Sequence, residues 1–176
     1  MALSHPISSD RNGLTPQTRA LVTAQLGREP RGAVAVAWVC PCGKPGVVMT
    51  APRLPDGRPF PTMYYLTCSR AVKAISTLEG SGVMATMTER LADEPVLAAQ
   101  YSAAHVTYLA DRAALGQELG LTVPEIDGQS AGGMPDRVKC LHALAAHALA
   151  KGPGVNPLGD ETLAAVGQFW AAPCLP

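Results

Sequence analysis

Apolar positions along the chain follow two different periods, which separate a strand-rich early region from a helical remainder. Residues 33–39 and 46–50 are runs of small and β-branched apolar residues, a pattern typical of strands. Residues 63–67 form a third run, in which Tyr64 and Tyr65 must point to opposite faces of a strand. Because Gly and Pro occur between the first two runs, we expect these to pair as a hairpin.

Helical spacing dominates the rest of the sequence. It predicts helices over residues 69–79, 83–91, 95–115 and 138–151, and a last helix that begins with Asp160 as its cap and runs toward Trp170. An earlier helix is expected over residues 15–26, with Thr15 as N-cap and Pro16 in the first turn. We therefore expect an α+β fold in one domain over residues 14–176, preceded by a disordered arm over residues 1–13. Its small antiparallel three-stranded sheet would pack against five or six helices.

Composition and charge exclude several classes of protein. The chain has 176 residues, of which 47% are hydrophobic, enough to build a buried core. Its 14 basic and 14 acidic residues give a formal net charge of zero, so we expect no nucleic-acid partner. No stretch reaches the roughly 20 apolar residues of a membrane helix, and residues 1–12 lack the apolar core of a signal peptide. We therefore expect a cytoplasmic protein without a membrane association.

The cysteines carry the main chemical hypothesis. In a reducing compartment, an odd number such as five favours metal binding or catalysis over disulfides. Cys40-Pro41-Cys42-Gly43 presents two sulfurs from one turn, Cys68 lies between a strand and a helix, and Cys140 lies near a helix start. We predict a thiolate site for zinc or an iron–sulfur cluster with Cys40, Cys42, Cys68 and Cys140 as ligands. The alternative is that these cysteines are small buried apolar residues and an incidental surface pair. The role of Cys174 stays open.

Histidines offer alternative ligands and candidate catalytic groups. On an ideal helix Cys140 and His147 share a face but lie about 10 Å apart, whereas Cys140 and His142 point in opposite directions. Cys140 is therefore the ligand expected from this helix, and packing or surface roles are favoured for both histidines. His105 lies on one helix face together with Leu97, Tyr101, Tyr108 and Arg112. That face is either a core stripe or a groove in which His105 acts as a general base.

Basic residues suggest a second kind of site. Arg53 lies in a proline-rich stretch over residues 51–61, for which we expect an Ω-type loop. Arg137 and Lys139 precede a helix start next to Gly132 and Gly133, where free amides would suit an anion. The alternative hypothesis is thus an enzyme for a small phosphorylated substrate, with these three residues as anchors and Cys140 or His142 as nucleophile or base. A solvated helix end is the other interpretation.

Several long sequence strings resemble those of a known family. These are Gly27-Arg28-Glu29-Pro30-Arg31-Gly32, Thr50-Ala51-Pro52-Arg53-Leu54-Pro55-Asp56-Gly57, Ser130-Ala131-Gly132-Gly133-Met134-Pro135-Asp136-Arg137-Val138-Lys139-Cys140-Leu141-His142 and Gly152-Pro153-Gly154-Val155-Asn156-Pro157-Leu158-Gly159-Asp160. Over residues 27–160 the chain resembles the actinobacterial "domain of unknown function 501" family.

The resemblance implies a cytoplasmic actinobacterial protein, often encoded beside a septum-formation initiator and an exopolyphosphatase. It therefore adds a third hypothesis, a non-catalytic interaction module in cell division or polyphosphate metabolism. It implies no catalytic residue. The residues that match its motifs and carry reactive or charged groups are Arg31, Cys40, Arg53, Asp56, Asp136, Arg137, Lys139, Cys140 and His142.

Overall fold

A three-stranded antiparallel sheet forms the early part of the chain, as the sequence predicts. The computed structural model describes residues 14–175, so the arm expected over residues 1–13 lies outside the described residues. Strands β1 (Ala33–Val39), β2 (Pro45–Thr50) and β3 (Tyr64–Leu66) pair in the order β1-β2-β3. The hairpin between β1 and β2 is therefore confirmed.

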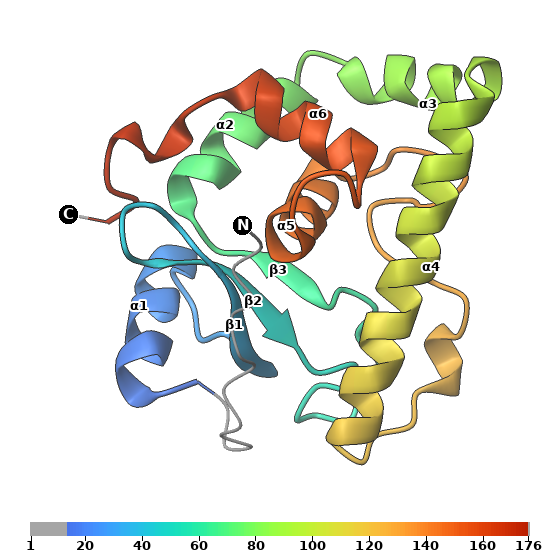
Figure 1. Ribbon diagram of the computed structural model, residues 1–176. Coiled ribbons are helices and arrows are strands. Elements are labelled where there is room, and N and C mark those ends of the chain that lie inside the picture. The colour runs from blue at the N-terminus through green and yellow to red at the C-terminus, as the bar shows by residue number, and fades with distance from the viewer. Residues whose placement is uncertain (1–13, 176) are drawn as a thin grey trace.

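Six α-helices and two short 3-10 helices surround this sheet within residues 14–175 (Figure 1). The α-helices are α1 (Pro16–Leu26), α2 (Ser69–Glu79), α3 (Val83–Asp93), α4 (Pro95–Glu118), α5 (Leu141–Lys151) and α6 (Pro157–Val166). The 3-10 helices are η1 (Pro124–Ile126) and η2 (Phe169–Ala171). The fold is α+β, as predicted. No helix in this part of the chain combines the length and apolar character that crossing a bilayer requires.

Helix starts agree with the sequence where the capping signal is local. The Thr15 side chain accepts a hydrogen bond from the Thr18 amide at 3.2 Å, and Pro16 opens α1. The last helix differs from expectation, since its N-cap is Asn156 and not Asp160. The Asn156 side chain accepts from the Gly159 amide at 2.9 Å. Asp160 instead accepts from the Gly154 amide, so α6 starts earlier than predicted and ends at Val166.

The start of α5 also differs from expectation, with consequences for the site. The sequence predicts a helix from residue 138, whereas α5 begins at Leu141. The Lys139 amide donates to the Gly132 carbonyl at 2.7 Å, and a turn that close leaves no room for a side chain at Gly133. The Val138 amide donates to the Thr88 hydroxyl on α3 at 3.0 Å. Because these contacts hold residues 138–140 outside the helix, Cys140 has an extended backbone.

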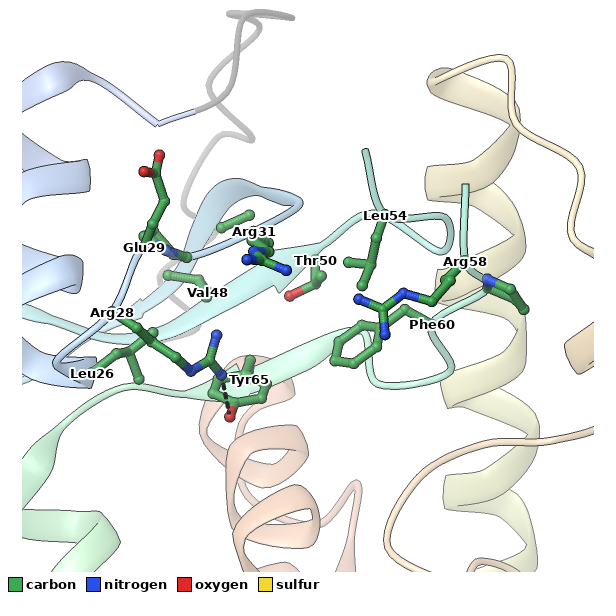
Figure 2. Close-up of a pocket in the computed structure, with 13 residues that line it drawn as sticks. Leu26, Arg28, Glu29, Arg31, Val48, Thr50, Leu54, Arg58, Phe60 and Tyr65 are labelled. Carbon is green, nitrogen blue, oxygen red and sulfur yellow. Dashed lines mark hydrogen bonds between the residues drawn. The ribbon is translucent and has the colours of Figure 1, made fainter. Parts of the chain in front are cut away.

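The two faces of the sheet have different surroundings. Val47, Tyr64 and Leu66 belong to the main core, and α5 packs against β3 on that side. Val48 and Ala33 belong to a smaller cluster with residues of α1. Between the end of α1, this second face and the loop after β2 lies a cavity of about 510 Å³ (Figure 2). Alternation along β2 thus separates a filled side from a side with a cavity.

Candidate functional site

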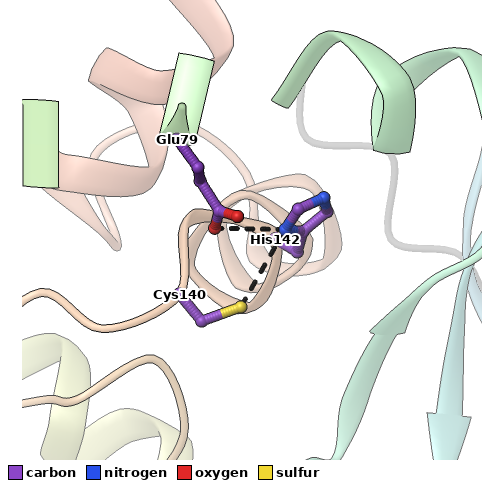
Figure 3. A group of neighbouring side chains, drawn as sticks. All are labelled: Glu79, Cys140 and His142. Carbon is purple, nitrogen blue, oxygen red and sulfur yellow. Dashed lines mark hydrogen bonds and ion pairs between the residues drawn. The ribbon is translucent and has the colours of Figure 1, made fainter. Parts of the chain in front are cut away.

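Glu79, Cys140 and His142 bring three different ligand groups together (Figure 3). Their ligand atoms all lie within 4.8 Å of one another, which no other set of three His, Cys, Asp or Glu side chains does in residues 14–175. Glu79 is the last residue of α2, and the other two flank the start of α5. The group therefore depends on how the end of one helix meets the beginning of another.

The hydrogen bonds of His142 fix which ring nitrogen faces the group. Nε2 lies 3.2 Å from the Val72 carbonyl, which can only accept, so Nε2 carries a proton. Nδ1 lies 3.1 Å from Glu79 Oε1 and 4.0 Å from Cys140 Sγ. In a neutral ring, Nδ1 would therefore direct a lone pair at two other acceptors. A cation, either a proton or a metal ion, is needed between them.

Charge interactions within the group shift its pKa values in opposite directions. The hydrogen bond with Cys140 and the charge of Glu79 raise the pKa of His142 to about 9, although burial opposes this. Burial disfavours the Cys140 thiolate, but hydrogen bonds with His142 and the Ala143 amide lower the pKa of that thiol. Both shifts therefore favour the pair of imidazolium and thiolate over the neutral pair.

The proximity of Cys140 to His142 corrects the helix argument made from the sequence. Ideal helix steps place these two side chains on opposite sides. Cys140 precedes the helix, however, with φ −153° and ψ 108°, so helical steps do not apply to it. Its sulfur can then turn toward His142. The relation to His147 is as expected, since His147 is fully buried elsewhere on α5 and is not part of the group.

A second cysteine group lies at the other end of α2. Cys42 Sγ is 3.7 Å from Cys174 Sγ. The charges of Cys42 and Cys68 act on the pKa values of both Cys40 and Cys174, so all four thiols are neighbours. The structure thus brings Cys40, Cys42 and Cys68 together and leaves Cys140 apart. Cys68 precedes α2 and Glu79 ends it, a separation of about 16 Å along the helix axis.

The thiols of this second group differ among themselves. Burial raises the pKa of Cys40 to about 12 and also raises that of Cys174. Burial opposes ionisation of Cys42 as well, but hydrogen bonds with the backbone of Cys174 and Lys44 lower its pKa to about 7. Cys42 is therefore the reactive thiol of the group at neutral pH.

The basic residues predicted to form an anion site do not come together. Arg53 donates to Glu125 at 2.9 Å and to the Thr122 carbonyl at 3.0 Å, beyond the C-terminal end of α4. The Arg137 carbonyl accepts from Tyr101, in the N-terminal half of α4. About 25 Å of helix separates these two places. The amides at residues 137–139 are hydrogen-bonded, and the Leu141 amide donates to Glu79 Oε1 at 2.7 Å, so the amide cradle expected beside Lys139 is taken up internally.

His105 lies apart from the Glu79 group. Its Nδ1 is 2.9 Å from the Ser130 hydroxyl, and burial lowers its pKa. On the same helix face Leu97, Tyr101, Tyr108 and Arg112 are buried, so the face packs into the core. Arg112 donates to the backbone carbonyls of Pro61, Gln129 and Ile126. These hydrogen bonds occupy the guanidinium donors that a ligand would otherwise use.

Two residues of these groups escaped the reasoning from sequence. Glu79 is the last residue before the Gly80-Ser81-Gly82 break, and nothing local marks it as a ligand. Cys174, whose role the sequence leaves open, has a side chain buried against Cys42. For Cys174 the cysteine itself was a signal, whereas Glu79 could be found only from the packing of α2 against α5.

Fold and site together define an α+β protein with two cysteine groups, one of which is a mixed carboxylate, thiol and imidazole group. The chain belongs to the family described as "Protein of unknown function (DUF501)", whose model matches residues 36–164. This confirms the resemblance drawn from the sequence strings. Comparison with curated proteins and with solved structures finds no match.

Proposed function

We propose that the protein binds a divalent transition-metal ion such as Zn²⁺ through Glu79, Cys140 and His142. A thiolate, an imidazole and a carboxylate are all zinc ligands, and this mixed set suits zinc better than magnesium or calcium. The observation that carries the proposal is the convergence of these three ligand atoms within 4.8 Å.

The orientation of His142 supports a metal at Nδ1. Metal-binding histidines usually donate their other N–H to a carbonyl or a carboxylate, which fixes the ring. Nε2 of His142 has the Val72 carbonyl at 3.2 Å for this purpose. An ion beside Nδ1 would also neutralise the Cys140 thiolate and the Glu79 carboxylate, which otherwise rely on a proton there.

The exposure of the group supports an ion with an open coordination position. The side chains of His142 and Glu79 are 24% and 23% exposed, so solvent reaches the group. Three protein ligands with solvent access are typical of catalytic zinc sites, whereas structural sites are closed by four ligands. The proposal therefore includes a position where water or a small ligand can bind the ion.

Cobalt binding tests the proposal, because a thiolate bound to Co²⁺ gives a charge-transfer absorption that reports the sulfur ligand. Metal-free protein should take up one Co²⁺ with this absorption. Cys140→Ser should abolish the absorption, and His142→Ala should greatly weaken binding. Cys42→Ser is the matched control and should behave as the wild type. Absence of uptake, or an absorption that survives in Cys140→Ser, would contradict the proposal.

The second cysteine group is a second candidate metal site, on one specific observation. Two thiolates bound to one tetrahedral zinc ion at about 2.3 Å lie about 3.8 Å apart. Cys42 and Cys174 lie 3.7 Å apart, and Cys40 and Cys68 lie near them, although neither sulfur is within 4.8 Å of both and each would have to move closer to bind the same ion. This set keeps three of the four ligands predicted from the sequence and replaces Cys140 by Cys174. The same cobalt experiment separates the candidates, since here Cys42→Ser would lose the absorption and Cys140→Ser would keep it.

A further inference from the structure

The cavity on the second face of the sheet is lined by arginines from two separate segments. Arg28 and Arg31 follow α1, and Arg58 lies in the loop after β2. Figure 2 shows the three guanidinium groups turned toward the same central space, above the rings of Tyr65 and Phe60. With a volume of about 510 Å³, the cavity has the size of a small-molecule site.

Two of these arginines are held in place by neighbours. Arg28 donates to the Tyr65 hydroxyl at 3.0 Å and lies 5.8 Å from the centre of that ring. Arg58 donates to Asp56 through Nε and an Nη nitrogen, at 2.9 and 2.6 Å. Since their side chains are already ordered, a ligand would lose little entropy by engaging them.

The positive charge of the cavity is balanced only in part. Asp56 pairs with Arg58 at 2.6 Å, whereas Glu29, the only carboxylate among the described residues of the lining, pairs with Arg19 at 3.3 Å. Arg31 forms no ion pair and no side-chain hydrogen bond with residues 14–175. An arginine with no ion pair or side-chain hydrogen bond to these residues is suited to a phosphate, whose oxygens accept paired N–H bonds.

The remaining wall of the cavity is apolar, and it determines which kind of group the ligand carries beside its phosphate. Val48 lies on this face of β2, and Leu54 and Phe60 close the loop side. A bare phosphate would leave this surface in contact with water. A flat aromatic body beside the phosphate would cover it and would stack on the aromatic side chain in this wall.

We propose that this cavity binds an aromatic phosphate of nucleoside monophosphate size. Arg28, Arg31 and Arg58 hold the phosphate, and the flat ring system lies against Phe60, Leu54 and Val48. The site is separate from the proposed metal group, which lies beyond the opposite face of the sheet. It also differs from the anion site expected from the sequence, since none of Arg53, Arg137 and Lys139 lines this cavity.

Titration calorimetry with adenosine monophosphate, adenosine, ribose 5-phosphate and inorganic phosphate tests the proposal on the full chain. Adenosine monophosphate should bind most tightly, and each of the other three should bind about tenfold more weakly or worse, since each lacks one half of the ligand. Equal binding of adenosine would contradict the role of the phosphate. Equal binding of ribose 5-phosphate would contradict the role of the apolar wall, and no binding of any probe would overturn the proposal.

Variants then locate the site. Arg31→Ala should weaken adenosine monophosphate by about tenfold or more, because a charged hydrogen-bond donor is lost. Arg31 is exposed and forms no side-chain hydrogen bond or ion pair with residues 14–175, so its removal should not unfold the protein. Phe60→Leu should weaken adenosine monophosphate but not inorganic phosphate. Arg70→Ala on α2 and Cys140→Ser are controls that should bind as the wild type. Unchanged affinity in Arg31→Ala would overturn the assignment.

Discussion

The two ends of α2 hold cysteine groups with different chemistry. At the N-terminal end, Cys40, Cys68 and Cys174 are buried, and the group consists of thiols alone. At the C-terminal end, Cys140 is partly exposed and shares its space with a carboxylate and an imidazole. Burial raises the pKa of Cys40 and of Cys174 in the first group, whereas hydrogen bonding to His142 favours the thiolate of Cys140 in the second. Surroundings, more than residue type, therefore decide what each cysteine can do.

Oxidation should form a disulfide in the cysteine group at the N-terminal end of α2 and none in the group at the C-terminal end. With hydrogen peroxide, the Cys42 thiolate attacks one peroxide oxygen to give a sulfenic acid and hydroxide, which takes a proton from solvent to become water. Attack by the Cys174 thiol then forms a disulfide and releases a second water. We expect peptide mapping to find a Cys42–Cys174 link, because these sulfurs lie 3.7 Å apart and the pKa of Cys42 is about 7. The link should be absent in Cys42→Ser and unchanged in Cys140→Ser. A link to Cys140 would contradict the assignment of the reactive thiol to the N-terminal end of α2.

Acid should destabilise the protein mainly by protonation of the buried His147, which belongs to neither cysteine group. Burial lowers the pKa of His147 from 6.5 to about 4. The unfolded chain then binds a proton that the folded chain excludes, so stability falls as the pH drops from 6.5 to 4 and levels off below. The total loss is about 3 kcal/mol. Urea unfolding across this range should show the slope in the wild type and a clearly smaller one in His147→Phe, where His105 still contributes. An equal slope in that variant would contradict the assignment.

His142 makes the stability depend on pH in the opposite direction, so the same unfolding experiment can distinguish the two histidines. Because its pKa is raised to about 9, His142 contributes stability that is full below pH 6.5 and is lost as the pH rises through 9. With a chelator present, His142→Gln should remove this alkaline loss and keep the acid slope. A variant that instead lost the acid slope would assign acid unfolding to the C-terminal end of α2.

A smaller effect should follow from removing the carboxylate at the C-terminal end of α2. Glu79 accepts from the Leu141 amide at 2.7 Å and so serves the first turn of α5 as a cap. Loss of a helix cap costs about 1 kcal/mol, so Glu79→Ala should lower the free energy of unfolding by about that amount. Glu79→Gln keeps an acceptor and should lose less. Glu89→Ala on α3 is a matched control, expected to change stability by less than about 0.5 kcal/mol. Equal losses of unfolding free energy in all three variants would contradict the capping role of Glu79.

Local signals explain what could be predicted from sequence. Thr15 and Pro16 start α1 through contacts within a few residues, and the Gly and Pro between β1 and β2 favour a turn whatever the rest of the chain does. Where a local signal competes with a distant partner, prediction was wrong. Residues 138–140 have helical spacing, yet hydrogen bonds to Gly132 and Thr88 keep them outside the helix.

The sequence alone therefore determined the α+β class, the hairpin, and the sharing of one turn by Cys40 and Cys42, because short-range periodicity and turn chemistry encode these features. Only the tertiary structure decided the partners of the cysteines. Glu79 and His142 are 63 positions apart, and Cys42 and Cys174 are 132 apart. Such contacts follow from how α2, α5 and the C-terminal segment pack around one core. Local sequence propensity does not predict that packing.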